Sequence, residues 1–231
     1  DFEGNTTLTN CIIQGQIKLT TSSSYTIAAD YNCTTTDLSA KGSGNIMSDP
    51  ALTRGGYLKK GSSCINAGTA TGAPARDIDG VIRPVGARPD IGCQEFKDTD
   101  NDGIPDNIET AAGLNPSSAA DATLDKDNDG LNNLNEYYSG TNINKADTDG
   151  DGINDKAEID QESDPLTPTR IVYVNASGGN DSNSGTTAAT AKKSIGAGVA
   201  NARQSGCENV VKVLPGTYAH AYDKNLNFGG Y

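Results

Sequence analysis

The residues most able to do chemistry in this chain are acidic side chains that recur in three short segments, which begin at Asp98, Asp125 and Asp147. In each segment aspartates occupy positions 1, 3 and 5, glycine position 6, aspartate or asparagine position 9, and glutamate position 12. This spacing collects hard oxygen ligands on one side of a tightly curled loop, which is the ligand set that Ca²⁺ prefers. The glycine supplies the backbone freedom that the sharp turn needs.

Each segment offers carboxylates, a main-chain carbonyl at position 7 and a final glutamate that can bind through both oxygens. Mg²⁺ demands a smaller octahedral shell with retained water, so the pattern predicts Ca²⁺, about three ions or more. The predicted metal ligands of the first loop are Asp98, Asp100, Asp102, Ile104, Asp106 and Glu109. Those of the second are Asp125, Asp127, Asp129, Leu131, Asn133 and Glu136, and those of the third are Asp147, Asp149, Asp151, Ile153, Asp155 and Glu158.

The alternative interpretation is an acidic, solvated linker that fits the pattern by chance. A single match would leave that alternative open. Three matches within 61 residues, each with its glycine and its glutamate, favour metal loops instead.

The charge of the chain is concentrated around these loops. The 231 residues carry a net charge of −12, but residues 98–164 hold 18 acidic and 3 basic side chains, a net −15, and the rest of the chain is at +3. Such a block would repel itself and stay disordered unless cations neutralise it. The balance excludes a nucleic-acid binder, and no apolar run approaches the roughly 20 residues of a membrane-spanning helix. We therefore expect neither nucleic-acid binding nor membrane insertion.

Short helices are expected directly after each loop, at Asp106–Ala112, Asn133–Tyr138 and Asp155–Ile159. Gly113 and Gly140 stand where a left-handed residue would end the first two. Few large apolar residues lie in this region, so bound metal must supply most of its stability.

The acidic block resembles thrombospondin type-3 repeats, which occur in tandem in bacterial surface and secreted proteins, and more distantly dockerin and EF-hand loops. The resemblance implies a calcium-binding, extracellular, structural module over residues 98–165. One departure from the EF-hand concerns position 8, where its buried aliphatic lies and where this chain has Pro105, Asn132 and Asn154. Paired EF-hand packing, and with it a sensor-type opening, is therefore not expected.

The segment before the block carries three short motifs in succession. They are SCINAG at 63–68, DIDG at 77–80 followed by Arg83-Pro84, and DIGCQEF at 90–96. This succession resembles the C-terminal end of bacterial right-handed parallel β-helix domains, which implies that residues 1–97 are the last rungs of such a domain.

The segment after the block has the features of a beginning. An apolar run at 171–175 is followed by a Gly/Asn/Asp loop, an expected helix near Ile195–Gln204, and the run VVKVLPGTY at 210–218. Residues 166–231 are thus similar to the N-terminal strand, cap and first rungs of the same β-helix class. The fold class predicted from these resemblances is mainly β, with parallel β-helix segments and an inserted module of calcium-binding loops and short helices. A generic β-sandwich of short strands is the alternative.

Five cysteines on expected β segments point to an oxidising extracellular setting. Cys11 and Cys33 lie 22 residues apart, about one turn of a parallel β-helix, so we expect them to form a disulfide. Cys93 stands where the resembled motif usually has alanine, which implies a Cys64–Cys93 bridge and leaves Cys207 free or bonded to another chain. The alternative is that all five are small buried apolar residues.

Catalytic material is scarce. The chain has one histidine, His220, which is expected in an exposed loop. The β-helix class includes pectate lyases, but their catalytic side chains come from central rungs that are mostly absent here. Asp77, Asp79 and Asp90 are assigned to turns and caps. We expect no enzymatic activity and no catalytic residue.

The function predicted is that of a calcium-stabilised structural protein on a bacterial surface or in a secreted assembly, either a spacer or a filament subunit. Its partner would be another copy joined head to tail, or the continuation of a longer chain; a polysaccharide ligand is left open. The main alternative is a linker fragment of a large secreted, lyase-like, polysaccharide-active enzyme or of an adhesin. A regulatory calcium sensor is a third interpretation.

Overall fold

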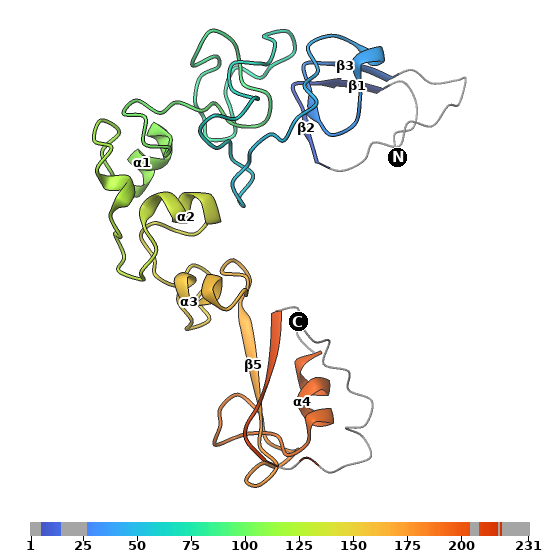
Figure 1. The fold of residues 1–231 in the computed structure, drawn as a ribbon, viewed down its shortest axis with the longest axis vertical. Coiled ribbons are helices and arrows are strands. Elements are labelled where there is room, and N and C mark those ends of the chain that lie inside the picture. Colours follow the sequence, from blue (N-terminus) through green and yellow to red (C-terminus); the bar gives the residue numbers. More distant parts are fainter. Residues whose placement is uncertain (1–5, 15–26, 204–207, 217, 219–231) are drawn as a thin grey trace. The chain divides into compact units, whose positions relative to one another are not determined.

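The computed structural model of the protein describes residues 6–14, 27–203, 208–216 and 218. The chain divides into two compact units, Asp1–Asn144 and Lys145–Tyr231. Figure 1 colours them from blue to red along the sequence, and each unit is described by itself below. The division falls inside the segment 98–165 expected to form one module, so the first two acidic loops belong to the first unit and the third to the second.

The first unit begins with two small parallel sheets. Thr6 lies opposite Ile27 in the first sheet, and Ile12 lies opposite Cys33 in the second. The first sheet pairs β1 (Thr6–Thr9) with β3 (Ile27–Asp30), and the second pairs β2 (Ile12–Ile13) with β4 (Cys33–Thr34). A short 3₁₀ turn, η1 (Ser39–Lys41), follows.

A buried asparagine holds the bend between these sheets. Asn32 is fully buried; its Nδ2 donates to the carbonyl oxygen of Leu8 at 3.1 Å, and its Oδ1 accepts from the amide of Cys11 at 3.0 Å. Asn10 and Tyr31 adopt left-handed backbone angles, each with φ of 55°. The side chain therefore replaces the ladder hydrogen bonds that the bend interrupts.

The prediction of a mainly β chain built on a parallel β-helix is wrong. Among the described residues there are three sheets of two strands each, no strand exceeds six residues, and no stack of rungs is present. The sheets are parallel, so the alternative of an antiparallel β-sandwich is not present there either.

The physical reason lies in the motifs at 77–96, which fold as a network of capped turns. Buried Glu95 accepts from the amides of Val85 and Asp90 at 2.9 and 2.8 Å. Buried Asp90 in turn accepts from the amides of Asn66 and Phe96 at 2.6 and 2.7 Å. Backbone amides that a β-helix would place in ladders are used by carboxylates here.

The turn roles expected for Asp77 and Asp90 are confirmed, whereas the Asp79 carboxylate accepts instead from the Tyr57 hydroxyl and from Asn107 Nδ2, both at 3.1 Å. Asp77 Oδ1 accepts from the amides of Asp79 and Val81, and Asp90 caps the turns just described. Arg83 forms a buried ion pair with Glu95, with Nη1 and Oε1 3.1 Å apart.

The predicted disulfides are not formed, since Cys11, Cys33, Cys64 and Cys93 are free thiols in the structure. The strand register explains the first case, because Ile12 rather than Cys11 lies opposite Cys33. In the second case Cys64 is fully buried and shares a core cluster with Cys33, whereas Cys93 is exposed. Cys207 and His220 lie outside the described residues.

The helices predicted after the first two loops are confirmed, as α1 (Asp106–Ala112) and α2 (Asn133–Ser139). Gly113 and Gly140 end them in left-handed conformations, with φ of 70° and 75°. Between the helices lies a 3₁₀ turn, η2 (Asp121–Thr123).

The acidic segment of the first unit packs against the residues that precede it. The hydroxyl of buried Tyr137 on α2 donates to the carbonyl oxygen of Leu58 at 2.7 Å. The backbone amide of Arg54 donates to the carbonyl oxygen of Tyr138 at 2.9 Å. Ile104, Ala122 and Tyr137 form a small apolar cluster. Loops one and two are therefore anchored to a fixed support.

The second unit consists of α3 (Asp155–Asp160), β5 (Thr169–Val174), α4 (Ile195–Ala202) and β6 (Glu208–Val213). The helices expected at Asp155–Ile159 and near Ile195–Gln204 are thus present, the latter up to Ala202 in the described residues.

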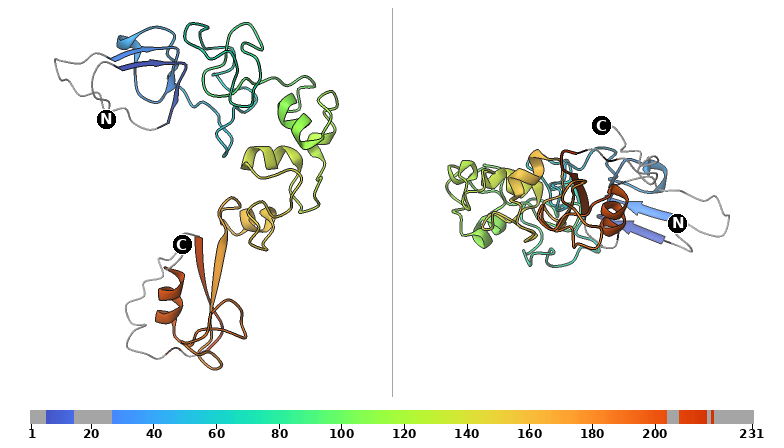
Figure 2. Two further views of the ribbon diagram at one scale, coloured as in Figure 1. Left: turned by 180° about the vertical axis from the view of Figure 1, so that it is seen from behind. Right: turned by 90° about the horizontal axis from the view of Figure 1, so that it is seen from below.

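A small core holds this unit together. β5 and β6 pair in parallel, and α4 packs against both strands (Figure 2). Val172, Val174 and Ile195 are buried. A Cβ at Gly198 of α4 would approach Val174 Cγ2 to 2.5 Å, so the glycine permits the close contact between helix and sheet. Within the described ranges, every helix is too short or too polar to span a membrane.

Candidate metal centres

The three acidic loops follow the same path because they share the same internal hydrogen bonds. The position-1 aspartate accepts from the amide of the position-6 glycine at 2.9 Å in all three loops. The position-5 aspartate accepts from the amide at position 7 at 2.8, 2.6 and 2.8 Å. The position-3 aspartate accepts from the amide at position 5 at 3.1 to 3.3 Å. Each loop is therefore shaped by its own carboxylates.

Left-handed backbone angles at positions 4 and 6 make this path accessible. The position-6 glycines have φ between 96° and 106°, as the sequence predicts. Position 4 is left-handed too, and carries Asn101, Asn128 or Gly150, with φ of 66°, 65° and 84°. Asparagine and glycine tolerate that conformation best, and this signal could have been read from the sequence.

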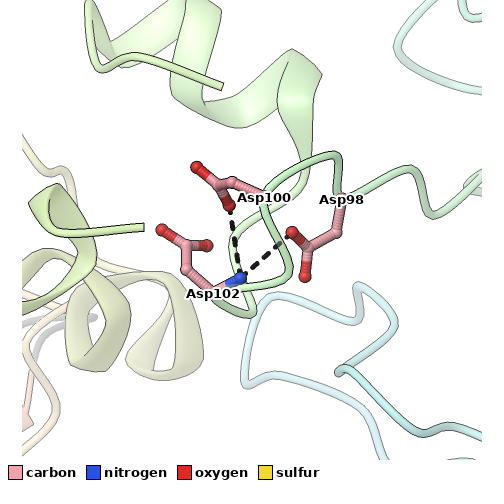
Figure 3. A group of neighbouring side chains, drawn as sticks. All are labelled: Asp98, Asp100 and Asp102. Carbon is pink, nitrogen blue, oxygen red and sulfur yellow. Dashed lines mark hydrogen bonds between the residues drawn. The ribbon is translucent and has the colours of Figure 1, made fainter. Parts of the chain in front are cut away.

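Carboxylates converge at the centre of each loop. In the first loop Asp98, Asp100 and Asp102 turn toward one another, and the first two both accept from the amide of Asp102 (Figure 3). One oxygen from each of the three lies within 4.8 Å of the others. The same holds for Asp125, Asp127 and Asp129 and for Asp147, Asp149 and Asp151. Nine of the predicted ligands are thus brought together as three triads that could hold a metal ion.

Several oxygens in these loops are buried without a hydrogen-bond partner. They include one carboxylate oxygen of the position-3 aspartate in each loop, Asp100, Asp127 and Asp149, and both oxygens of Glu109. A buried carboxylate with no partner is strongly unfavourable. A cation in the triad would satisfy these oxygens directly, so the residues present fit a bound metal ion.

The position-12 glutamates lie near the triads, at the first turn of the helix that follows each loop. Glu109, Glu136 and Glu158 are fully buried. Burial, together with the charges of Asp102 and Asp100, raises the pKa of Glu109 to about 8. Burial and the charges of Asp149 and Asp151 raise the pKa of Glu158 to about 7. Both shifts arise first from burial and then from neighbouring carboxylates.

The position-9 side chains are not gathered into the triads. Asp106 accepts from the amide and the hydroxyl of Thr99 at 2.8 and 2.7 Å, and Asp155 accepts from the amide and the hydroxyl of Thr148 at 2.7 and 2.6 Å. Asn133 Oδ1 accepts from the amide of position 2 in its own loop at 3.2 Å. These side chains therefore tie the start of each loop to the following helix. Although burial opposes it, hydrogen bonds from Lys97 and Thr99 hold the pKa of Asp106 below its usual value.

The aliphatic residue at position 7 serves the apolar packing. Ile104 and Leu131 are buried, with 0% and 6% of their surface exposed, and Ile153 is half-buried. Their amides are held by the position-5 aspartates, as described above.

In the second and third loops position 8 is an asparagine that caps the next helix. Asn132 Oδ1 accepts from the amide of Asn135 at 2.9 Å, and Asn154 Oδ1 accepts from that of Ala157 at 2.8 Å. Pro105 stands at the corresponding place before α1. The departure from the EF-hand pattern thus has a structural cause, since a side chain that caps a helix cannot also fill an apolar core.

One acidic residue near these sites was missed by the sequence analysis. Oxygens of Asp102, Glu109 and Asp121 lie within 4.8 Å of one another, although Asp121 is outside the twelve-residue pattern. Its sequence signal is weak: it is the one acidic residue among positions 110–124.

Comparison with known proteins identifies residues 98–119 and 147–168 as bacterial TSP3 repeats. The resemblance to thrombospondin type-3 repeats is therefore confirmed for the first and third loops. The second loop, at 125–136, lies between the matched segments, yet it shares their hydrogen bonds. TSP3 repeats are calcium-binding structural repeats and are typically extracellular. Neither the curated proteins nor the solved structures that were searched contain a match to the chain.

Proposed function

We propose that this chain is a calcium-stabilised structural element of an extracellular bacterial assembly, with one Ca²⁺ in each of its three acidic loops. The observation that carries the proposal is the repeated triad of carboxylates, each with a buried position-3 oxygen that has no partner. Bound Ca²⁺ would supply the positive charge that cancels the repulsion within each triad.

The residues of the chain divide the work of binding. The triad aspartates supply one oxygen each, and the glutamate at position 12 approaches from the helix, where it can bind through both oxygens. The position-9 side chain keeps loop and helix in register, and the position-8 side chain starts the helix. Metal binding would thereby order loop and helix together.

The specific role that we propose is that of a spacer or a subunit joined head to tail. Among the described residues, β5 and β6 pair only with each other apart from one bridge between Val174 and Lys192. Val210 and Val213 of β6 expose 42% and 38% of their surface. A two-stranded sheet is marginally stable alone, so the pairing of a further strand would stabilise it.

An enzymatic role is not part of the proposal. An open cleft of about 690 Å³ lies in the first unit and is lined by Ile12, Pro74, Arg76, Asp77 and Ile78 among others. Asp77 is its one carboxylate among the lining residues, and its oxygens already accept from three backbone amides. Among the described residues that line the cleft, there is no second carboxylate to form the pair that a glycosidase needs. The runner-up, a linker of a larger polysaccharide-active enzyme or adhesin, places any activity elsewhere.

Sedimentation velocity, with and without millimolar Ca²⁺ and with Mg²⁺ as the control cation, tests the assembly role. Concentration-dependent large species in Ca²⁺ that dissociate on chelation would support a subunit joined head to tail. A monomer in both buffers would support the spacer or linker and refute self-assembly.

Limited proteolysis tests the calcium scaffold itself. Residues 98–164 are expected to resist cleavage in Ca²⁺ and to be cut after chelation. Equal cleavage in both conditions would contradict a structural role for the metal.

A further inference from the structure

Asp121 lies beyond the first acidic loop but faces its glutamate. One oxygen each of Asp102, Glu109 and Asp121 fall within 4.8 Å of one another. Asp121 Oδ1 is buried without a hydrogen-bond partner, as is Asp102 Oδ2. Glu109 is itself fully buried, and neither of its oxygens has a partner. Three carboxylates therefore meet in a protected place, and four of their six oxygens receive no hydrogen bond from the described residues.

The position of Asp121 is set by contacts outside this cluster. Its Oδ2 accepts from the amide of Asn115 at 2.8 Å, and its carbonyl oxygen accepts from Asn133 Nδ2 at 2.8 Å. The next residue, Ala122, is 2% exposed and packs with Ile104 and Tyr137. Packing thus holds η2 in place and keeps the Asp121 carboxylate beside those of Asp102 and Glu109.

The third loop shows how such a place is filled without an extra ligand. There Thr169, the first residue of β5, donates from its amide to Asp151 Oδ2 at 2.5 Å and from its hydroxyl to Glu158 Oε1 at 3.4 Å. The corresponding oxygens of the first loop, on Asp102 and Glu109, face Asp121 instead. Threonine can donate a hydrogen bond, whereas ionised aspartate can only accept. The first loop therefore requires a cation where the third has a donor.

We infer that Asp121 is a ligand of the first calcium site, supplied from outside the twelve-residue loop. This inference rests on the proposed calcium binding and adds a residue that neither the loop pattern nor the matched segment 98–119 contains. An additional carboxylate raises the ligand charge of the site, and ligand charge is one of the factors that set calcium affinity. The first site should therefore bind calcium more tightly than the third.

The same residue connects the first site to the second loop. Asn133, whose Nδ2 donates to the Asp121 carbonyl, is position 9 of the second loop, and its amide donates to the carbonyl oxygen of Leu124 at 2.8 Å. Calcium held by Asp121 fixes η2, and η2 holds the start of the second loop. Binding at the first site therefore favours binding at the second, and the third site, in the other unit, serves as an internal reference.

The test is a calcium titration of the full chain by isothermal calorimetry, comparing Asp121→Asn with wild type. At least one binding step should weaken at least about tenfold, since a charged ligand becomes a neutral one, while the number of ions stays at three. Asp37→Asn is the matched control, because Asp37 is an exposed residue of the same unit and only caps a turn. Binding steps that are all unchanged in Asp121→Asn would overturn the inference. Loss of an additional ion beyond the three, with the three loop affinities unchanged, would also overturn it, because Asp121 would then belong to a separate site.

Hydrogen exchange gives a second readout that does not depend on affinity. Calcium should slow exchange of the amides at 114–126 in wild type and in Asp37→Asn, but much less in Asp121→Asn. Equal protection in all three chains would contradict the ordering of η2 by calcium bound to Asp121. If Asp121→Asn does not fold, Asp121→Thr reproduces the donor of the third loop and is measured instead, with the same outcomes.

Failure of this inference is distinguishable from failure of the proposed function. If wild type binds three ions and Asp121→Asn binds them equally well, only the role of Asp121 is refuted. If wild type binds no calcium, the scaffold itself is refuted.

Discussion

Replacing Asp149 by asparagine should change the stability of the second unit in opposite directions with and without calcium. Asp149 accepts from the amide of Asp151 at 3.1 Å through Oδ1, while Oδ2 is buried and has no partner. Asparagine keeps the first interaction through its own carbonyl oxygen and removes the charge. The substitution therefore isolates the electrostatic role of the carboxylate from its role in shaping the loop.

The magnitude follows from mass action. A site at 100-fold saturation stabilises the folded state by about 2.7 kcal/mol. If the lost charge weakens affinity about 100-fold, the site is half-saturated and contributes roughly 0.4 kcal/mol, so the variant loses about 2 kcal/mol in calcium. A unit of this size responds with a fall in Tm of about 10 °C. In chelator the variant should gain stability, since repulsion from Asp147 and Asp151 is relieved by about 1 kcal/mol per nearby charge in a water-like dielectric.

Differential scanning calorimetry of the full chain, in millimolar Ca²⁺ and in chelator, measures both effects. Asp160→Asn is the matched control, because Asp160 is exposed and pairs only with Lys156 on the same helix. The transition of the first unit should not move in either variant, since the third loop belongs to the second unit. A fall in Tm of equal size in both buffers would refute the reasoning, because the carboxylate would then stabilise the loop without metal.

Three further predictions concern groups whose environment the structure defines. The folded-state pKa of Glu109 is raised to about 8 by burial and then by the charges of Asp102 and Asp100. In chelator its contribution to stability is therefore present below its unfolded pKa of about 4.3 and is lost as pH rises toward 8. Thermal unfolding in chelator should show a higher Tm at pH 5 than at pH 8, and the opposite order would contradict the shift. Burial, and then contact with the Cys33 thiol, raises the pKa of Cys64 to about 12, whereas Cys93 is exposed. Iodoacetamide followed by peptide mass analysis should therefore label Cys93 before Cys64, and early labelling of Cys64 would contradict its burial. Arg83→Ala leaves the buried Glu95 carboxylate without its cation, so the free energy of unfolding of the first unit, measured in urea, should fall by about 3–5 kcal/mol. A fall below about 1 kcal/mol would show that the ion pair is not structurally important.

The acidic loops and their helices could be predicted from the sequence because each is determined within a short stretch of chain. The aspartates accept from amides two to five residues away, and the turns need only glycine or asparagine at set positions. The helices start at side-chain caps such as Asn132 and end at glycines such as Gly140. The division into domains 1–97, 98–165 and 166–231, and the absence of enzymatic activity, stay predictions.

The flanking fold could not be predicted in the same way, because local motifs there serve nonlocal partners. The sequence around Asp90 and Glu95 resembles the end of a β-helix, yet in the structure these carboxylates hold amides of neighbouring turns. Cysteine pairing failed for a related reason, since a shift of one residue in register puts Ile12 opposite Cys33 and leaves Cys11 beside it. Whether a carboxylate or a cysteine meets a partner depends on which segments pack together.

The sequence by itself determined the chemistry of the three loops: the residue types, their spacing and the turns that gather the carboxylates. Only the tertiary structure decided that Asp106 and Asp155 tie the loops to their helices, that the first two loops belong to one unit, and that Asp121 joins Asp102 and Glu109. The physical reason is the range of the interactions. A loop closed by hydrogen bonds over a few residues carries its geometry in its own sequence, whereas η2 is placed by the packing of Ala122 against residues from two other elements.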